Sequence, residues 1–151
     1  MRHSIYSHCA GAEGVPQLLQ DEVAGAIGSV PVKAQKGSGG RIRDAILENL
    51  IERGWSRPFS VSPKSGMTIT SLKSGVGLCV QTGNMARMYA DLLKLQKLYL
   101  DDAIQAAVMV LPSSPMAKAI GSNVAHANRL ERELEILRRV ITVPMIVFGL
   151  E

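Results

Sequence analysis

Acidic residues are missing from one long stretch of this sequence, between Arg53 and Ala90. Long apolar runs are missing too, since none reaches the roughly 18 residues that a membrane span needs. The longest, such as AAVMVL and PMIVFGL, have the length of buried strands. The opening residues MRHSIYSHCAGAEG contain no continuous apolar segment of the kind found in secretory signals. We therefore expect a cytoplasmic protein with no membrane partner.

Cysteine is scarce as well, with only Cys9 and Cys79, which lie too far apart in sequence to suggest a disulfide framework. Hydrophobic residues make up 46% of the chain and charged residues 20%, a balance typical of globular proteins rather than disordered ones. Its 151 residues have the size of one ordinary domain. We expect a single domain spanning residues 1–151.

Positive charge is concentrated in one part of the chain. The formal net charge is +4, yet residues 31–75 alone carry eight Lys and Arg against three Asp and Glu. A local excess of this kind attracts polyanions through counterion release. A solvated basic face that binds no nucleic acid would have the same composition, so charge alone leaves both interpretations open.

The pattern of apolar residues predicts alternating helices and strands. Helices are expected at residues 15–28, 41–54, 84–100 and 124–140, where apolar residues recur at helical spacing. Two short runs, 67–73 and 76–83, are joined at Ser74-Gly75 and predict an antiparallel hairpin. Buried strands are expected at 104–112 and 141–150, with Pro144 at an early or edge position. Residues 113–123 are expected to form a loop, and the N-terminus a flexible end. This order predicts an α/β sandwich on a mixed central sheet flanked by helices.

The hairpin has the layout of a two-carboxylate magnesium site without its carboxylates. Residues two apart share a face of a strand, so Cys79 and Gln81 point the same way, as do Thr68 and Thr70. Carboxylates at such positions on adjacent strands hold Mg²⁺, which activates water and stabilises the charge developing on a phosphate. Other motifs are weaker. GVGLCV lacks the third glycine of a dinucleotide fingerprint, and a Cys79–His126 nucleophilic pair competes with a simple buried cysteine.

The segment VGLCVQTGNMARMYADLLKLQ, with ERGW before it and GSNVAHANRLERELEILRRVITVPMIVFGLE after it, resembles the BglII/BstYI-type restriction endonucleases of the PD-(D/E)xK nuclease superfamily. The resemblance covers about residues 40–151. It implies a restriction-endonuclease-like α/β sandwich and a homodimer that cuts double-stranded DNA with Mg²⁺. It also implies a signature glutamine on the active-site strand in place of the superfamily's usual lysine.

Carried over residue by residue, the resemblance places Gln81 at the signature glutamine and Gly83-Asn84 at the turn that follows it. Cys79 then stands where the family has its metal-binding Glu, and Thr70 where it has the metal-bridging Asp. Both carboxylates are replaced, which puts cleavage in doubt. Glu48 is a possible supporting ligand, and Glu48 and Asp91 are candidate metal ligands if the acids have moved.

Three functions follow from these residues. The first is a DNA-binding protein whose cleavage is weak or absent, the second an active Mg²⁺-dependent endonuclease with relocated carboxylates, and the third a partner-binding protein that kept only the fold. Loops 54–66 and 112–123 would read bases. Candidate phosphate contacts are Lys64, Lys73, Asn84, Arg87, Arg41 and Arg43.

Overall fold

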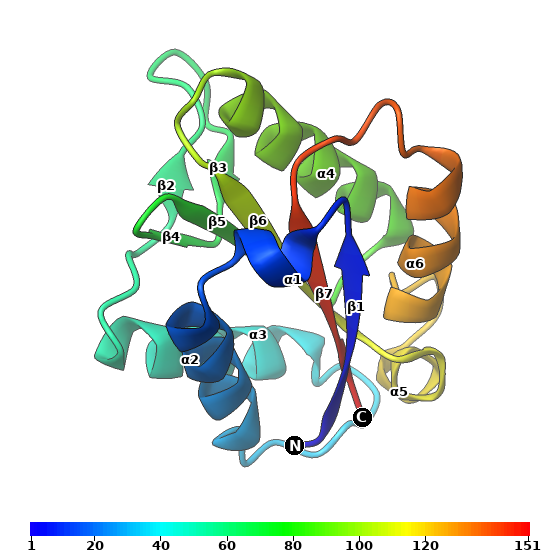
Figure 1. The fold of residues 1–151 in the computed structure, drawn as a ribbon. Coiled ribbons are helices and arrows are strands. Elements are labelled where there is room, and N and C mark those ends of the chain that lie inside the picture. The colour runs from blue at the N-terminus through cyan, green and yellow to red at the C-terminus, as the bar shows by residue number, and fades with distance from the viewer.

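A computed structural model of the protein describes all residues, 1–151, and is built on a central sheet of five strands (Figure 1). The strands lie in the order β1-β7-β6-β5-β4. Strand β5 pairs in parallel with β6, and β6 with β7, whereas β1 and β4 pair antiparallel at the two edges. The sheet is mixed and flanked by helices, which confirms the predicted fold class. Its strands are β1 (His3–His8), β4 (Ser71–Lys73), β5 (Val76–Val80), β6 (Ala106–Pro112) and β7 (Met145–Leu150).

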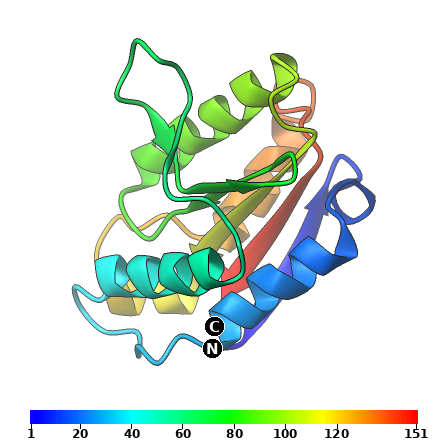
Figure 2. The ribbon, with the colours of Figure 1, turned by 90° about the vertical axis from the view of Figure 1, so that its left-hand side faces the viewer.

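Helices cover both faces of this sheet, and each face has its own apolar core (Figure 2). The short helix α1 (Gly11–Gly14) leads into α2 (Gln17–Gly28), which packs beside α3 (Gly39–Glu52) on one face. On the other face lie α4 (Met85–Leu100) and α6 (Ala127–Ile136). Successive side chains of strand β5 enter the two cores in turn. Leu78 and Val80 face α2 and α3, whereas Cys79 faces α4.

Helices α3 and α4, which flank the site, are explained by apolar spacing in α3 and by an N-terminal cap in α4. In α3, Ile42, Ile46 and Leu50 recur every four residues and are fully buried, as the sequence predicted. Helix α4 begins at a true cap, because the Asn84 side chain accepts a hydrogen bond from the Ala86 backbone N–H at 2.8 Å. Met88 lies on the buried face of α4, and this face anchors the helix beneath β5.

Two local expectations were wrong. The N-terminus forms the edge strand β1, paired with β7 from His3 to His8, because backbone pairing compensates for its weak apolar pattern. The expected loop 113–123 contains helix α5 (Ser114–Ile120). Pro144 immediately precedes β7, in agreement with the expected early position, and β7 is an inner strand because β1 covers its free side. The predicted hairpin is confirmed as β4–β5, although the preceding β3 (Thr68–Ile69) pairs instead with β2 (Phe59–Ser60) in a separate small sheet.

None of the helices is both long enough and apolar enough to cross a bilayer.

Candidate functional site

A polar cleft of about 520 Å³ opens where β5 ends, between α3 and the first half of α4. Helix α3 is held close to the end of β5, because the Thr82 hydroxyl donates to the Gly39 carbonyl at 2.8 Å. A Cβ at Gly39 would come within 2.8 Å of the Thr82 carbonyl oxygen, so this approach requires glycine. The cleft is lined by Gly40, Arg43, Thr68, Thr70, Val80, Gln81, Thr82, Gly83, Arg87, Ala90, Asp91 and Lys94.

Gln81 and Asp91 meet on the floor of this cleft. The Gln81 side-chain amide donates to Asp91 Oδ2 at 2.6 Å and accepts from the Gly83 N–H at 2.9 Å. The other Asp91 oxygen, Oδ1, receives the Lys94 ammonium at 3.2 Å. Burial raises the pKa of the Asp91 carboxyl above its ordinary value, and the bonds from Gln81 and Lys94 only partly counter this. The carboxylate is thus nearly enclosed and has partners on both oxygens.

Thr70 reaches the cleft, and Cys79 does not. The Thr70 hydroxyl accepts the Val80 backbone N–H at 3.0 Å. It thereby extends the pairing of β5 beyond Ser71, the first residue of β4. Cys79 is 1% exposed and lies in the core beneath α4. Burial, and then the nearby Asp91 carboxylate, raise the pKa of the Cys79 thiol. A neutral, buried thiol is a poor ligand for a hard cation such as Mg²⁺.

The other candidate acids lie outside the cleft or are paired beside it. Glu48 is exposed on α3 and does not line the cavity. Asp44 borders an adjoining cavity together with Asp91, but its carboxylate is bound by its neighbour Arg43 at 2.8 Å. No group of three or more His, Cys, Asp and Glu residues comes together anywhere in the chain. The residues at this site do not fit a Mg²⁺ ion held by paired carboxylates.

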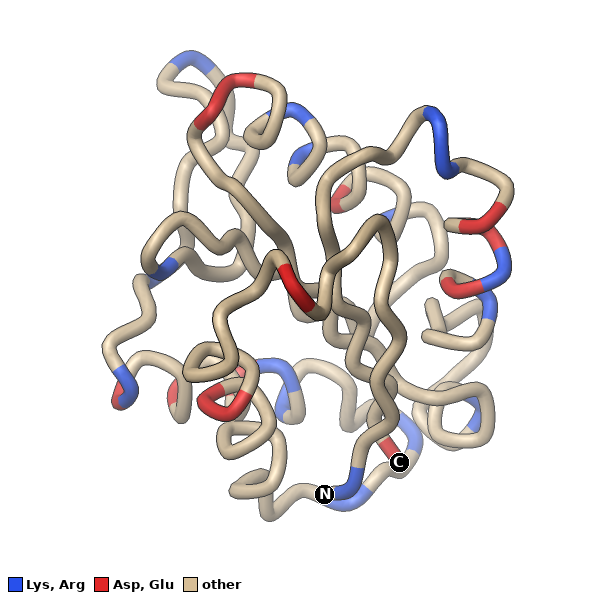
Figure 3. The backbone as a smooth tube through the Cα atoms, viewed as in Figure 1, with Lys and Arg blue, Asp and Glu red and all other residues tan.

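Cations line both walls of the cleft. Lys and Arg positions occur along both α3 and α4, the helices that flank it (Figure 3). Arg43 projects from α3, and Arg87 and Lys94 project from α4. The Arg87 guanidinium lies above Gly83, since a Cβ there would be 3.9 Å from its Nη1 atom. Against these three cations stand two carboxylates, Asp91 in the lining and Asp44 paired with Arg43 beside it, which leaves a local charge of +1. Lys94 was not among the predicted phosphate contacts, although its three-residue spacing from Asp91 places it on the Asp91 face of the helix.

The remaining predicted contacts fall elsewhere. Arg41 and Lys64 are exposed but do not line the cleft. Asn84 lies next to the cleft lining as the cap of α4. The backbone donors there are already used, because the N–H groups of Ala86 and Arg87 bind Asn84 and that of Met85 binds the Asn123 carbonyl.

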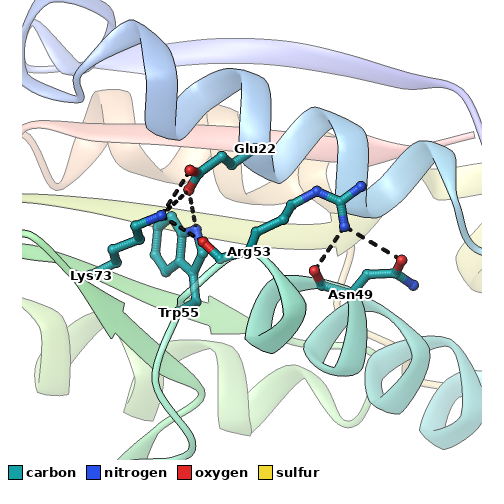
Figure 4. Close-up of polar contacts among 5 residues, drawn as sticks. All are labelled: Glu22, Asn49, Arg53, Trp55 and Lys73. Atoms are coloured by element: carbon teal, nitrogen blue, oxygen red, sulfur yellow. Dashed lines mark hydrogen bonds and ion pairs between the residues drawn. The ribbon is translucent and has the colours of Figure 1, made fainter.

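Lys73 is held in a network beneath the hairpin (Figure 4). Its ammonium lies 2.7 and 2.8 Å from the two Glu22 oxygens and donates to the Arg53 carbonyl at 2.6 Å. The Trp55 indole N–H also donates to Glu22, at 2.8 Å. Lys73 therefore ties β4 to α2 and to the end of α3.

Neither cysteine has a catalytic base. The Cys9 sulfur lies 3.3 Å from His8 Nε2, but that nitrogen is 2.6 Å from the Ile141 carbonyl oxygen, which can only accept. His8 Nε2 therefore carries a hydrogen and cannot take the thiol proton. His126 caps α6 by accepting the Arg129 N–H at 3.2 Å, which leaves it no role beside Cys79.

Comparison with known proteins gives a consistent result. The family model described as restriction endonuclease BglII/BglIII matches residues 3–150. The crystal structure of restriction endonuclease BglII complexed with a DNA 16-mer is similar at a TM-score of 0.87 and 14% identity, over 99% of this chain and 76% of that one. The crystal structure of free BglII is similar at a TM-score of 0.81 and 15% identity, over 100% of this chain and 80% of that one. No curated protein sequence matches the chain.

Proposed function

Because the chain belongs to the BglII/BglIII family of restriction endonucleases, we propose that it binds double-stranded DNA in the cleft and that its cleavage is weak or absent. The family resemblance seen in the sequence is confirmed by this match. The observation that carries the proposal is the charge of the cleft. Arg43 on one wall and Arg87 and Lys94 on the other outnumber the two carboxylates beside them, Asp91 and Asp44, an arrangement suited to the phosphates of a nucleic acid.

The proposed loss of cleavage rests on the two positions that the resemblance assigns to the family's metal ligands. Thr70 presents a hydroxyl that already accepts a backbone hydrogen bond, and Cys79 presents a buried thiol. Neither supplies the negative charge that draws Mg²⁺ out of water. Gln81, at the family's signature position, is engaged with Asp91.

The proposed DNA contacts are divided by where each side chain lies and by how many of its donors are already bonded. Arg43, Arg87 and Lys94 line the cleft and would contact the phosphates nearest its floor, and Asn84 lies beside them. Arg41 and Lys64 are exposed outside the cleft and would reach more distant phosphates. Lys73 is left out of the contact set because Glu22 and Arg53 already hold its ammonium.

We further propose that the protein is a homodimer, as the resemblance implies. Large apolar side chains are exposed on one face of α4 and at the end of α6, where Leu93 is 62%, Leu100 71%, Ile136 82% and Val140 61% exposed. Helices α4 and α6 lie side by side, since the Tyr89 hydroxyl donates to Glu133 at 2.6 Å. An apolar surface of this kind suits a self-complementary contact. Light scattering that gives the mass of one chain at micromolar concentration would refute the dimer.

An active endonuclease with relocated carboxylates is the second candidate, and the position of Asp91 favours it. Asp91 is the acid on the cleft floor, beside Gln81. Glu48, the other acid considered from the sequence, is exposed outside the cleft. In this alternative Asp91 would be the carboxylate ligand, with substrate oxygens completing the coordination of Mg²⁺.

The test is to incubate supercoiled plasmid with the protein in Mg²⁺, in Mn²⁺ and in EDTA. The proposal predicts intact plasmid that is retarded in all three and released by salt. Metal-dependent relaxed or linear product, abolished by Asp91→Asn, would establish the second candidate. Intact and unretarded plasmid would refute DNA binding and leave a partner-binding role.

A matched pair of variants then locates the binding surface. Arg87→Ala removes a guanidinium of the cleft, whereas Arg139→Ala removes an exposed one on the loop after α6. The first is expected to reduce the slope of log affinity against log salt by about 0.9 for each phosphate that Arg87 neutralises, and the second to leave the slope unchanged. Equal effects would contradict binding in the cleft.

A further inference from the structure

We propose that the Lys94 ammonium is a built-in cation that takes the place of a metal ion, so that the cleft binds a DNA phosphate without any divalent cation. This inference rests on the proposed DNA binding and adds which cation binds the phosphate at the Asp91 side of the cleft. Lys94 lies on α4, one turn after Asp91, and its ammonium is 3.2 Å from Asp91 Oδ1.

Lys94 supplies the positive charge that balances the buried Asp91 carboxylate. The Asp91 carboxylate is nearly buried, with 11% of its side chain exposed, and an enclosed carboxylate needs a counter-charge. Its Oδ2 atom is taken by the neutral Gln81 amide, so Lys94 supplies the positive charge at Oδ1. A divalent ion could bind Asp91 only by displacing this ammonium, against repulsion from the neighbouring Arg87 and Arg43.

Lys94 also remains able to bind a ligand. Its side chain is 21% exposed to the cleft, and an ammonium has three donors, of which Asp91 takes one. Arg87 lies two turns earlier on the same face of α4 and lines the same wall. A phosphate entering between them would be met by an ammonium and a guanidinium, with the Asp91 carboxylate behind Lys94 acting as an anchor.

The decisive variant is Asp91→Asn, because the two possible roles of Asp91, as the partner of the Lys94 cation or as a metal ligand, predict opposite changes in DNA affinity. If Lys94 is the cation, loss of the Asp91 charge removes repulsion of the phosphate and leaves the ammonium uncompensated. DNA binding should then tighten at least about threefold, with a salt slope steeper by about 0.9. If Asp91 is a metal ligand, the same variant should weaken binding in Ca²⁺. Asparagine keeps one acceptor oxygen, which can serve Gln81 or Lys94 but not both, and thermal melting checks that the fold is retained.

The assay is fluorescence anisotropy of a labelled duplex oligonucleotide, in EDTA and in Ca²⁺ at matched ionic strength. Wild-type affinity should agree within about twofold between the two buffers. A tenfold difference in affinity would correspond to about 1.4 kcal/mol of binding free energy supplied by the metal ion. Lys94→Gln should lower the salt slope by about 1. Lys97→Gln is the control, because Lys97 lies on the same helix but pairs with Asp101, outside the cleft.

The outcomes separate this inference from the function on which it rests. Absence of salt-dependent binding overturns both. Binding that strengthens tenfold or more in Ca²⁺, or that weakens in Asp91→Asn, overturns the inference and leaves DNA binding intact. An equal salt slope in Lys94→Gln and Lys97→Gln overturns it as well.

Discussion

The network around Glu22 is expected to contribute strongly to stability, and Glu22→Gln tests this. Glu22 accepts from Lys73 and from Trp55, and Lys73 also donates to the Arg53 carbonyl (Figure 4). The ion pair has little exposure, with 17% of the Glu22 side chain and 23% of the Lys73 side chain accessible. It joins α2, the end of α3 and strand β4, and thereby holds the hairpin of the cleft against the α3 wall.

The size of the effect follows from the geometry. Two unit charges 2.7 Å apart attract by about 6 kcal/mol at an effective dielectric constant of about 20. Desolvation of the two ions offsets several kcal/mol of this attraction. Glutamine keeps an acceptor but loses the charge, so we expect the free energy of unfolding to fall by about 2 kcal/mol. For a chain of this length that corresponds to a melting temperature lower by about 4–8 °C.

The exposed pair Lys97–Asp101 provides a matched control. Its nitrogen and oxygen are also 2.7 Å apart, but the two side chains are 49% and 51% exposed. Asp101→Asn should therefore change the free energy of unfolding by about 0.5 kcal/mol or less. Urea denaturation followed by circular dichroism at pH 7 measures both variants. Equal losses in the two would show that burial is not what makes the Glu22 pair strong.

The pH dependence provides an independent check. Burial alone would raise the pKa of the Glu22 carboxyl, but the hydrogen bonds from Lys73 and Trp55 outweigh it and lower that pKa below its ordinary 4.5. The contribution of Glu22 is therefore fully present above about pH 4.5 and is lost as pH falls through the lowered value. The stability gap between wild type and Glu22→Gln should narrow in acid. A gap that widens below pH 4.5 would contradict the assigned partners.

Three further predictions concern the cleft and the sheet. Thr70→Asp combined with Cys79→Glu would place carboxylates at the two positions that the family resemblance assigns to metal ligands, and we expect more Mg²⁺-dependent nicking of plasmid than with the wild type. A double variant that folds and binds DNA without this gain would refute the assignment of these two positions. Because the pKa of Asp91 is raised in the folded protein, the wild type loses stability as pH rises from 3.8 through that pKa. In urea denaturation, the stability of Asp91→Asn relative to wild type should therefore be more favourable at pH 7 than at pH 3. The reverse order would contradict burial of the charge. Gly11→Ala would place a Cβ against the Met145 carbonyl of β7 and should cost about 3 kcal/mol, whereas Gly28→Ala, which meets nothing within 4 Å, should leave the melting temperature nearly unchanged.

The sequence alone determined the elements whose pattern is local. Ile42, Ile46 and Leu50 repeat at helical spacing, and the apolar run from Ala106 to Pro112 has the length of a buried strand, so both elements were predicted correctly. The lack of acids between Arg53 and Ala90 is a property of the chain that no fold can change.

Other features depend on contacts between distant parts of the chain. Strand β1 carries little apolar signal because it is an edge strand, and only pairing with β7, at the other end of the chain, makes it a strand. In the same way, Lys73 looked like a free cation until folding brought Glu22 to it across 51 residues.

The chemistry of the cleft shows the same division. The family resemblance assigned Thr70, Cys79 and Gln81 to the site as an expectation, and the three-residue spacing of Asp91 and Lys94 places both on one helical face. Tertiary packing then turned Cys79 into the core and enclosed the Asp91 carboxylate between Gln81 and Lys94. Burial decides whether a charge is solvated or must be paired, and burial is a property of the whole fold rather than of any short segment.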